Sequence, residues 1–181
     1  MLPAVLVNYQ KEKGTADEQI VRALYTAAGI GQVVAARAYI AGASGGCQAE
    51  IGTASAMAAG ALTALGGGTP SQITHAAAMA LKNLLGLVCD PVGGLVEVPC
   101  VKRNVIGSVN ALSAADMALA GIISRIPPDQ VIDAMREVGD QMHPSLRETG
   151  QGGLANTPAA REWCAAQEKK KKKLLFSENF W

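Results

Sequence analysis

The stretch EIGTASAMAAGALTALGGG, residues 50–68, decides the fold that this sequence predicts. Its side chains are mostly small or apolar and lack the alternation of β-branched and aromatic residues that marks strands, so we expect a helix from Glu50 to Leu65. The glycine triplet at residues 66–68 ends this helix. So few bulky side chains let neighbouring backbones come close, which favours tightly packed helices.

The composition of the 181-residue chain supports the same fold. Its length is that of one domain, and 49% apolar residues are enough to build a hydrophobic core. Only 4% of the residues are aromatic and 20 are glycine, so small side chains must form that core. We therefore predict an all-α fold, a compact bundle of about six to seven small-residue-rich helices joined by Gly/Pro-rich loops.

Helix signals recur on both sides of residues 50–68. Thr69 is a predicted N-cap, because Pro70 follows at the first helical position and Gln72 lies three residues past the cap. The predicted helices cover residues 2–13, 17–39 (with Ile20, Leu24 and Ala27/Ala28 on one face), 50–65, 70–85, 102–123 and 127–142.

The character of the sequence changes after residue 167. Five consecutive lysines, residues 169–173, form a charge run of the kind that is usually solvated. We therefore predict a helical domain over residues 1–167 and a Lys-rich tail without fixed structure over residues 168–181.

Charge and hydropathy argue against several kinds of partner. A net charge of +1 creates no broad positive field, and basic and aromatic residues are not interleaved, so nucleic acid is not expected to bind. The weakly polar stretch 51–68 is too rich in Ala, Gly, Ser and Thr to enter lipid, so no membrane contact is expected. No basic leader precedes the apolar start, which predicts a cytoplasmic protein with reduced cysteines.

Three of the four cysteines lie in segments rich in glycine and proline. Cys47 ends AGASGGC, residues 41–47, and CDPVGGLVEVPC runs from Cys89 to Cys100. This composition opposes regular helix and predicts folded loops, whose backbone can bend around an inorganic core. From spacing alone three interpretations stay open, namely buried apolar cysteines, a zinc site or an iron–sulfur site.

Longer stretches around these cysteines point to one family. GGCQAEIGTASAMAAGAL (residues 45–62), LGLVCDPVGGLVEVPCVKRNVIGSVNA (85–111) and LRETGQGGLANTP (146–158) resemble the α chain of iron–sulfur-dependent L-serine dehydratases. The resemblance implies that Cys47, Cys89 and Cys100 bind a [4Fe-4S] cluster and leave one iron open to substrate. Cys164 lies where the resemblance fades and is predicted to be a packed or surface thiol.

The resemblance also implies an activity and partners. The expected reaction is the dehydration and deamination of L-serine to pyruvate and ammonia, with the cluster as Lewis acid. Family α chains carry a segment before the position of Met1, so we expect a fragment, a truncated reading frame or one part of a split enzyme. A β chain or that N-terminal segment, and oligomerisation, would complete it. The alternatives are a non-catalytic fragment or subunit whose cluster site needs partner segments, and a related cluster-dependent cysteine desulfidase.

Charged residues near the cysteines are further candidates. Lys102 and Arg103 lie two and three residues after Cys100 and could neutralise cluster charge or bind the substrate carboxylate, although a solvated helix start explains them equally well. Glu50 could orient a ligand or accept a proton, or it could simply complement a helix N-terminus. Weaker candidates of the same kind are Asp90 and Asn104, and two isolated histidines, His75 and His143, are expected to be structural.

Overall fold

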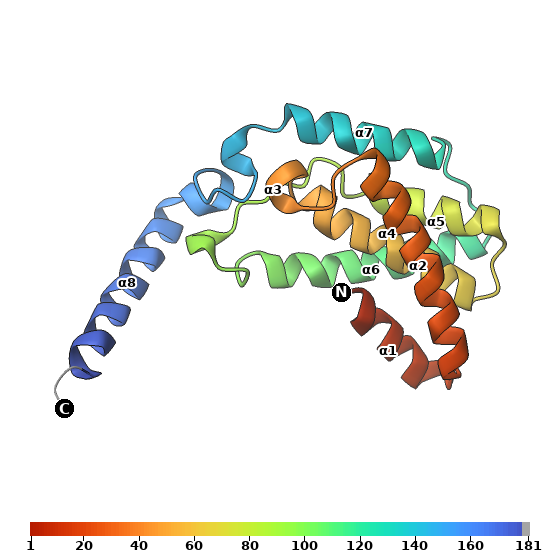
Figure 1. The fold of residues 1–181 in the computed structure, drawn as a ribbon, viewed down its shortest axis with the longest axis horizontal. Coiled ribbons are helices and arrows are strands. Elements are labelled where there is room, and N and C mark those ends of the chain that lie inside the picture. Colours follow the sequence, from red (N-terminus) through yellow and green to blue (C-terminus); the bar gives the residue numbers. More distant parts are fainter. Residues whose placement is uncertain (179–181) are drawn as a thin grey trace.

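Helices make up most of the chain in this computed structural model, which describes the backbone of residues 1–178 and the side chains of residues 1–170. Within these residues there are eight α-helices and no strand, so the predicted all-α fold is confirmed (Figure 1). The helices are α1 (Leu2–Lys13), α2 (Asp17–Arg37), α3 (Gly42–Gly45), α4 (Thr53–Leu65), α5 (Pro70–Lys82), α6 (Cys100–Leu119), α7 (Pro128–Gln141) and α8 (Pro158–Glu178).

Helix α4 lies at the centre of the bundle, where it packs against α2, α5 and α6. Its small residues allow this, because a methyl group added at Gly60 would overlap with Cδ1 of Ile30 on α2. The prediction that small side chains build the core is therefore confirmed. Fully buried alanines on α4 include Ala56, Ala58, Ala59 and Ala61.

Local signals placed the start of α5 correctly. The Thr69 hydroxyl accepts from the backbone N–H of Gln72 (3.3 Å), while the Gln72 side-chain oxygen accepts from the Thr69 N–H (2.9 Å). This reciprocal pair is the predicted capping box. The end of the helix was predicted less well, because α5 stops at Lys82 and a turn follows up to Gly86.

Several predicted bounds and one predicted face need correction. The helix expected from Glu50 begins with a π-helical turn, Gln48–Gly52, and α6 spans Cys100–Leu119 in place of residues 102–123. On α2 the predicted face is wrong in part, since Leu24 is 42% exposed. Ala28 is exposed too, whereas Ala27, as predicted, and Ala23 face α4, because small side chains permit the closer approach that its alanines require.

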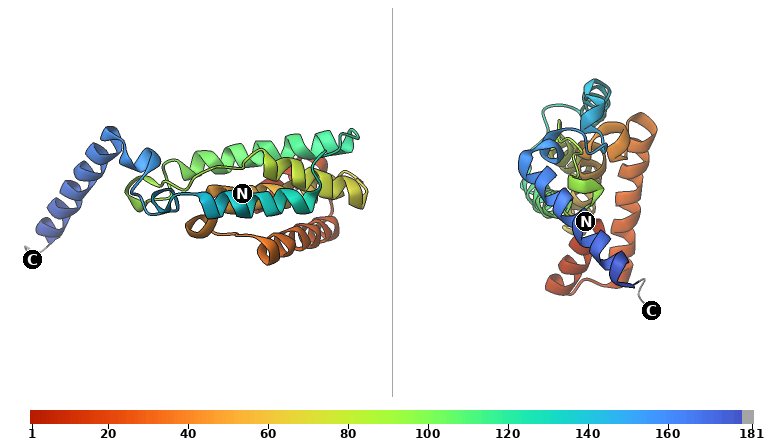
Figure 2. Two further views of the ribbon diagram at one scale, coloured as in Figure 1. Left: turned by 90° about the horizontal axis from the view of Figure 1, so that it is seen from above. Right: turned by 90° about the vertical axis from the view of Figure 1, so that its left-hand side faces the viewer.

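Helix α8 extends away from the bundle (Figure 2). It continues through the lysine run to Glu178 and so crosses residue 167, where we predicted the domain to end. That domain limit stays a prediction. Residues 179–181 of the predicted tail lie outside the described residues. Among the helices of the described part, none combines the length and apolar character that crossing a bilayer requires.

Candidate functional site

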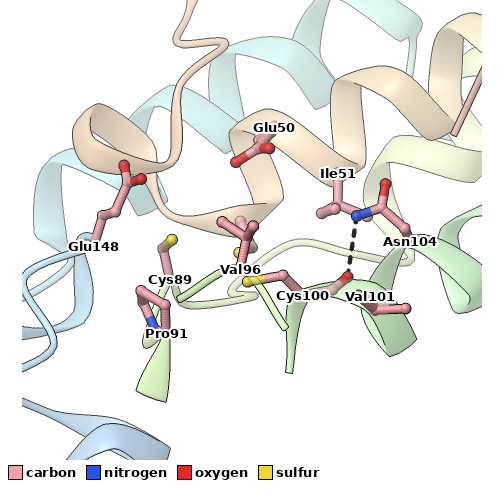
Figure 3. A pocket seen from close by; sticks show the side chains of 10 residues that line it. Glu50, Ile51, Cys89, Pro91, Val96, Cys100, Val101, Asn104 and Glu148 are labelled. Carbon is pink, nitrogen blue, oxygen red and sulfur yellow. Dashed lines mark hydrogen bonds between the residues drawn. The ribbon is translucent and has the colours of Figure 1, made fainter. Parts of the chain in front are cut away.

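Three cysteines from separate parts of the sequence line one cavity of about 290 Å³ (Figure 3). Cys47 comes just before the π-helical turn, Cys89 lies in the loop after α5, and Cys100 is the first residue of α6. The cavity therefore forms where three segments meet at one end of the bundle. Its walls are Cys47, Glu50, Ile51, Cys89, Pro91, Val96, Cys100, Val101, Asn104 and Glu148.

Cys47 is held by its neighbours in the sequence. Gly46 ends α3 with a φ of 77°, a left-handed conformation that suits glycine, and so turns the chain towards the cavity. Gln48 is fully buried, and its backbone N–H donates to the carbonyl of Leu87 (2.9 Å). These constraints leave the Cys47 thiol only 2% exposed.

Cys89 is held by a segment far along the chain. Its N–H donates to the carbonyl of Leu146 (2.8 Å), and its carbonyl accepts from the N–H of Glu148 (2.7 Å), which forms a short parallel bridge around Arg147. Gly42 on α3 lies against the other side, where an added Cβ would be 2.9 Å from the Cys89 sulfur. Cys89 is therefore held between the backbone of residues 146–148, which is hydrogen-bonded to it, and Gly42, where the lack of a side chain leaves room for the sulfur.

The three thiols affect one another's ionisation. Burial is the main cause that raises the pKa of Cys47, Cys89 and Cys100 above the ordinary thiol value. Cys47 and Cys89 belong to the same buried cluster, and their interaction lowers the pKa of Cys47 and raises that of Cys89. All three are protonated at neutral pH when free, so a metal that binds them must displace protons.

Arg103 is the cation of the site, although it does not line the cavity. Its Nη1 donates to Oδ1 of Asp90 (2.7 Å) and to the Val88 carbonyl (2.8 Å), and lies 3.9 Å from the Cys47 sulfur. Burial lowers the pKa of Arg103, but Asp90 and Cys47 together raise it by more, so the guanidinium stays charged. It can offset negative charge at Cys47 while it joins α6 to the Cys89 loop.

The other predicted site residues divide into two groups. Glu50 and Asn104 line the cavity, and the Asn104 amide donates to the carbonyl of Cys100 (3.0 Å). Lys102 is exposed and lies outside the cavity walls, as do both histidines; Nδ1 of His143 accepts from the Ser145 N–H (3.2 Å). The remaining cysteine, Cys164, lies beside Gly93, also outside the cavity walls.

Glu148 is a cavity residue that the sequence did not single out. It belongs to the stretch LRETGQGGLANTP, whose glycines predicted only a break between helices. Its place beside Cys89 depends on the backbone bridge described above, for which the sequence carries no local signal. Figure 3 shows the carboxylates of Glu148 and Glu50 on the same side of the Cys89 and Cys100 sulfurs.

The donor set can be tested against the groups that cysteines hold. Among the described side chains, no group of three or more His, Cys, Asp or Glu residues is arranged around the position of a single metal ion. A single zinc ion needs its thiolates gathered within bonding distance of one point, whereas an iron–sulfur cluster spreads its ligands around a larger core. Three thiols on the walls of one cavity fit the cluster better.

Comparison with known proteins finds similar chains along most of this sequence. Residues 1–155 match the family described as serine dehydratase alpha chain. A probable L-serine dehydratase alpha chain of Bacillus subtilis is 59% identical over 162 residues, which cover 90% of this chain and 54% of that protein. The L-serine dehydratase alpha chain of Peptoniphilus asaccharolyticus is 49% identical over 162 residues, 90% of this chain and 56% of the relative.

Relatives of another length match as well. The L-serine dehydratase of Mycobacterium tuberculosis is 48% identical over 160 residues, 86% of this chain but 35% of that protein. The chain thus spans about half the length of the alpha chains from Bacillus and Peptoniphilus, and about a third of the Mycobacterium protein. The matched residues include all three cavity cysteines, and the chain belongs to the serine dehydratase alpha chain family.

Proposed function

We propose that this chain is the cluster-binding part of an enzyme that converts L-serine to pyruvate and ammonia. The observation that carries the proposal is the meeting of Cys47, Cys89 and Cys100 at one cavity beside a partly buried arginine. Relatives named L-serine dehydratase support the substrate and the reaction. The donor set and the sequence resemblance support the proposed cofactor.

In this proposal the three cysteines hold a [4Fe-4S] cluster as thiolates. A bound cluster with one iron not held by cysteine supplies a Lewis acid that offsets the charge on the departing hydroxide. Arg103 lies close enough to Cys47 to balance part of the thiolate charge. Asp90 and Val88 hold its guanidinium in place, so we assign Arg103 to charge balance and not to direct contact with substrate.

The chemistry requires one proton acceptor and one leaving group. The Cα proton of serine is removed and the Cβ–O bond breaks, so that hydroxide leaves as water and 2-aminoacrylate remains. Aminoacrylate tautomerises to an imine, which water hydrolyses to pyruvate and ammonia. Glu50 faces the cavity and is our candidate for the proton acceptor. Lys102, exposed two residues after Cys100, does not line the cavity and remains a weaker candidate for contact with substrate.

An exposed apolar surface supports the expected partner. Val101, Val105, Val109 and Leu112 recur every three or four residues on α6 and share one side of that helix, and each is 44–58% exposed. We call these four residues the α6 stripe. It begins at the cavity wall, since Val101 lines the cavity. We propose that the remaining part of the enzyme, a β chain or N-terminal segment, covers the α6 stripe and closes the site.

Two alternatives lead to different observations. A non-catalytic subunit would bind iron only beside its partner and would release no pyruvate by itself. A cysteine desulfidase would release sulfide from L-cysteine faster than it releases pyruvate from L-serine. Comparing sulfide release from L-cysteine with pyruvate formation from L-serine therefore distinguishes a desulfidase from a dehydratase, even if both use the same cluster.

The proposal can be tested by reconstitution under anaerobic conditions. The chain would be loaded with iron and sulfide, alone and with the additional segments that its relatives carry, and iron, visible absorption and pyruvate from L-serine would be measured. Bound cluster with pyruvate supports the proposal, and Cys89→Ala should remove both. Cys164→Ala is the matched control, because Cys164 lies outside the cavity and should leave both unchanged. A protein that binds no iron even with its partner would overturn the proposal.

A further inference from the structure

Glu148 has an uncommon backbone conformation. Its φ is 64°, and among the described residues it is the one non-glycine residue in the left-handed region. Residues with a long side chain rarely adopt this conformation, which glycine and asparagine tolerate far better. A glutamate at this position therefore needs an explanation beyond the turn itself.

The contact with Cys89 fixes this conformation. The Glu148 N–H donates to the Cys89 carbonyl (2.7 Å), and two residues earlier the Leu146 carbonyl accepts from the Cys89 N–H (2.8 Å). On the following side the Thr149 hydroxyl donates to the carbonyl of Ser145 (3.1 Å). Because the backbone is held on both sides, the Glu148 side chain is directed to the cavity wall beside Cys89 (Figure 3).

The walls of the cavity are acidic. Glu50 and Glu148 are its charged residues, Asn104 adds an amide, and no Lys, Arg or His belongs to the walls among the described side chains. Arg103, the nearby cation, is engaged with Asp90 and Val88. Bound thiolates would add further negative charge, so the cavity has a place for a cationic group of the ligand.

An α-amino acid carries such a group, its ammonium. In the proposed reaction Glu50 is assigned to the proton, so Glu148 is the wall carboxylate without a role. We propose that Glu148 binds the α-ammonium group of the substrate and makes the site selective for amino acids over hydroxy acids. This inference rests on the proposed function. It concerns binding through a charge-assisted hydrogen bond and requires no proton transfer by Glu148.

The test compares two ligands that differ in the ammonium group. In the assembled, reconstituted enzyme, Glu148→Gln keeps the size of the side chain but removes its charge. We expect KM for L-serine to rise about 10- to 100-fold, the range for loss of a charged hydrogen bond, while kcat changes far less. Inhibition by L-glycerate, which has a hydroxyl in place of the ammonium, should be unchanged or stronger.

Two further variants serve as controls. Glu137→Gln removes an exposed carboxylate on α7 away from the cavity and should change neither constant. Glu148→Gly removes the carboxylate and suits the left-handed backbone, so it gives the same test if Glu148→Gln folds poorly. Thermal unfolding of each variant separates loss of binding from loss of structure.

The outcomes distinguish this inference from the proposed function. If the native enzyme forms pyruvate but Glu148→Gln keeps its KM, or weakens L-serine and L-glycerate equally, the inference is wrong and the function stands. If the native enzyme forms no pyruvate, the function fails. Calorimetric titration with both ligands then decides the inference alone, because equal affinities of native protein and variant for L-serine would overturn it.

Discussion

Arg103 and Asp90 form a largely buried ion pair in which Nη1 and Oδ1 are 2.7 Å apart, with side chains 17% and 3% exposed. The other oxygen of Asp90 accepts from the N–H of Leu154 (2.7 Å). One carboxylate therefore joins α6, the loop after Cys89 and the turn Gly153–Asn156. These segments contribute to the cavity or support it, so the pair connects the geometry of the site to the stability of the fold.

Removal of one partner should destabilise the protein strongly. In Arg103→Gln the Asp90 carboxylate would stay buried without its cation, and breaking a buried pair in this way costs about 3–5 kcal/mol. Urea unfolding of the metal-free chain measures this loss. Arg125→Gln, at an exposed arginine, should change the free energy of unfolding by less than about 0.5 kcal/mol. Equal effects of the two variants would contradict the role of the pair.

The sequence predicted those features that depend on nearby residues. The capping box of Thr69 and Gln72 involves residues three apart. The small residues of α4 are visible in the sequence and indicate that neighbouring helices pack closely against it. The cysteines could be recognised because glycines and prolines surround them and because the stretches resemble a family. In each case the signal lies in a short window of sequence.

Features that depend on distant contacts could not be predicted. Gln48 follows a cysteine and is polar, yet it is fully buried because its side chain bonds the Met135 carbonyl (3.0 Å) and the Gly86 N–H (2.9 Å). Glu148 reaches the cavity only through its bridge to Cys89. Leu24 is exposed because the approach of α2 to α4 selects alanines for the contact face. These outcomes follow from tertiary packing, which no local pattern records.

The close approach of α3 to the site can be tested with an added methyl group. In Gly42→Ala the new Cβ would lie 2.9 Å from the Cys89 sulfur and 3.2 Å from Oε2 of Glu50, so both side chains must move. We expect a loss of about 1–3 kcal/mol in the metal-free chain, as for other overpacked sites, and reduced iron after reconstitution. Both are measurable by denaturant unfolding and iron analysis.

Gly29→Ala is the matched control for this substitution. Gly29 lies within α2, and an added Cβ there would meet no atom within 4 Å. Alanine should stabilise the helix by about 0.5–1 kcal/mol and leave iron binding unchanged. If Gly42→Ala behaved like this control, the approach of α3 to Cys89 would not matter to the site.

A tyrosine near the Cys47 loop predicts how stability changes at alkaline pH. The Tyr39 hydroxyl donates to Oδ1 of Asp140 on α7 (2.6 Å), and this hydrogen bond raises the pKa of Tyr39 above its ordinary value. The folded state thus holds the proton more tightly than the unfolded state, in which the pKa is about 10. The stabilisation is complete below that pH and is lost as the pH rises through the folded pKa.

Tyr39→Phe should therefore lower stability at neutral pH, and its difference from the native chain should shrink as the pH rises above about 10. Chemical unfolding of both proteins at a series of pH values measures this difference in the free energy of unfolding. The ionisation of other groups affects both proteins equally and therefore cancels in the difference. Asp140→Asn tests the same bond from the other side. A difference that stays constant across the range would show that the hydrogen bond does not control the titration of Tyr39.

The α6 stripe predicts a substitution that separates folding from assembly. Val105 is 58% exposed in the middle of the stripe, so Val105→Glu should change the free energy of unfolding of the isolated chain by less than about 0.5 kcal/mol. A charge placed in an apolar interface has to be desolvated, however, so binding to the proposed partner, a β chain or N-terminal segment, should weaken at least about tenfold. Val21→Glu, at a valine 49% exposed on α2, adds the same charge outside the stripe and should leave binding intact.

Sedimentation of mixtures measures both effects, and it also reports self-association. If Val105→Glu abolished a dimer of this chain but left binding of the other segment unchanged, a second copy would cover the α6 stripe, and the proposed partner would have to close the cavity from another side.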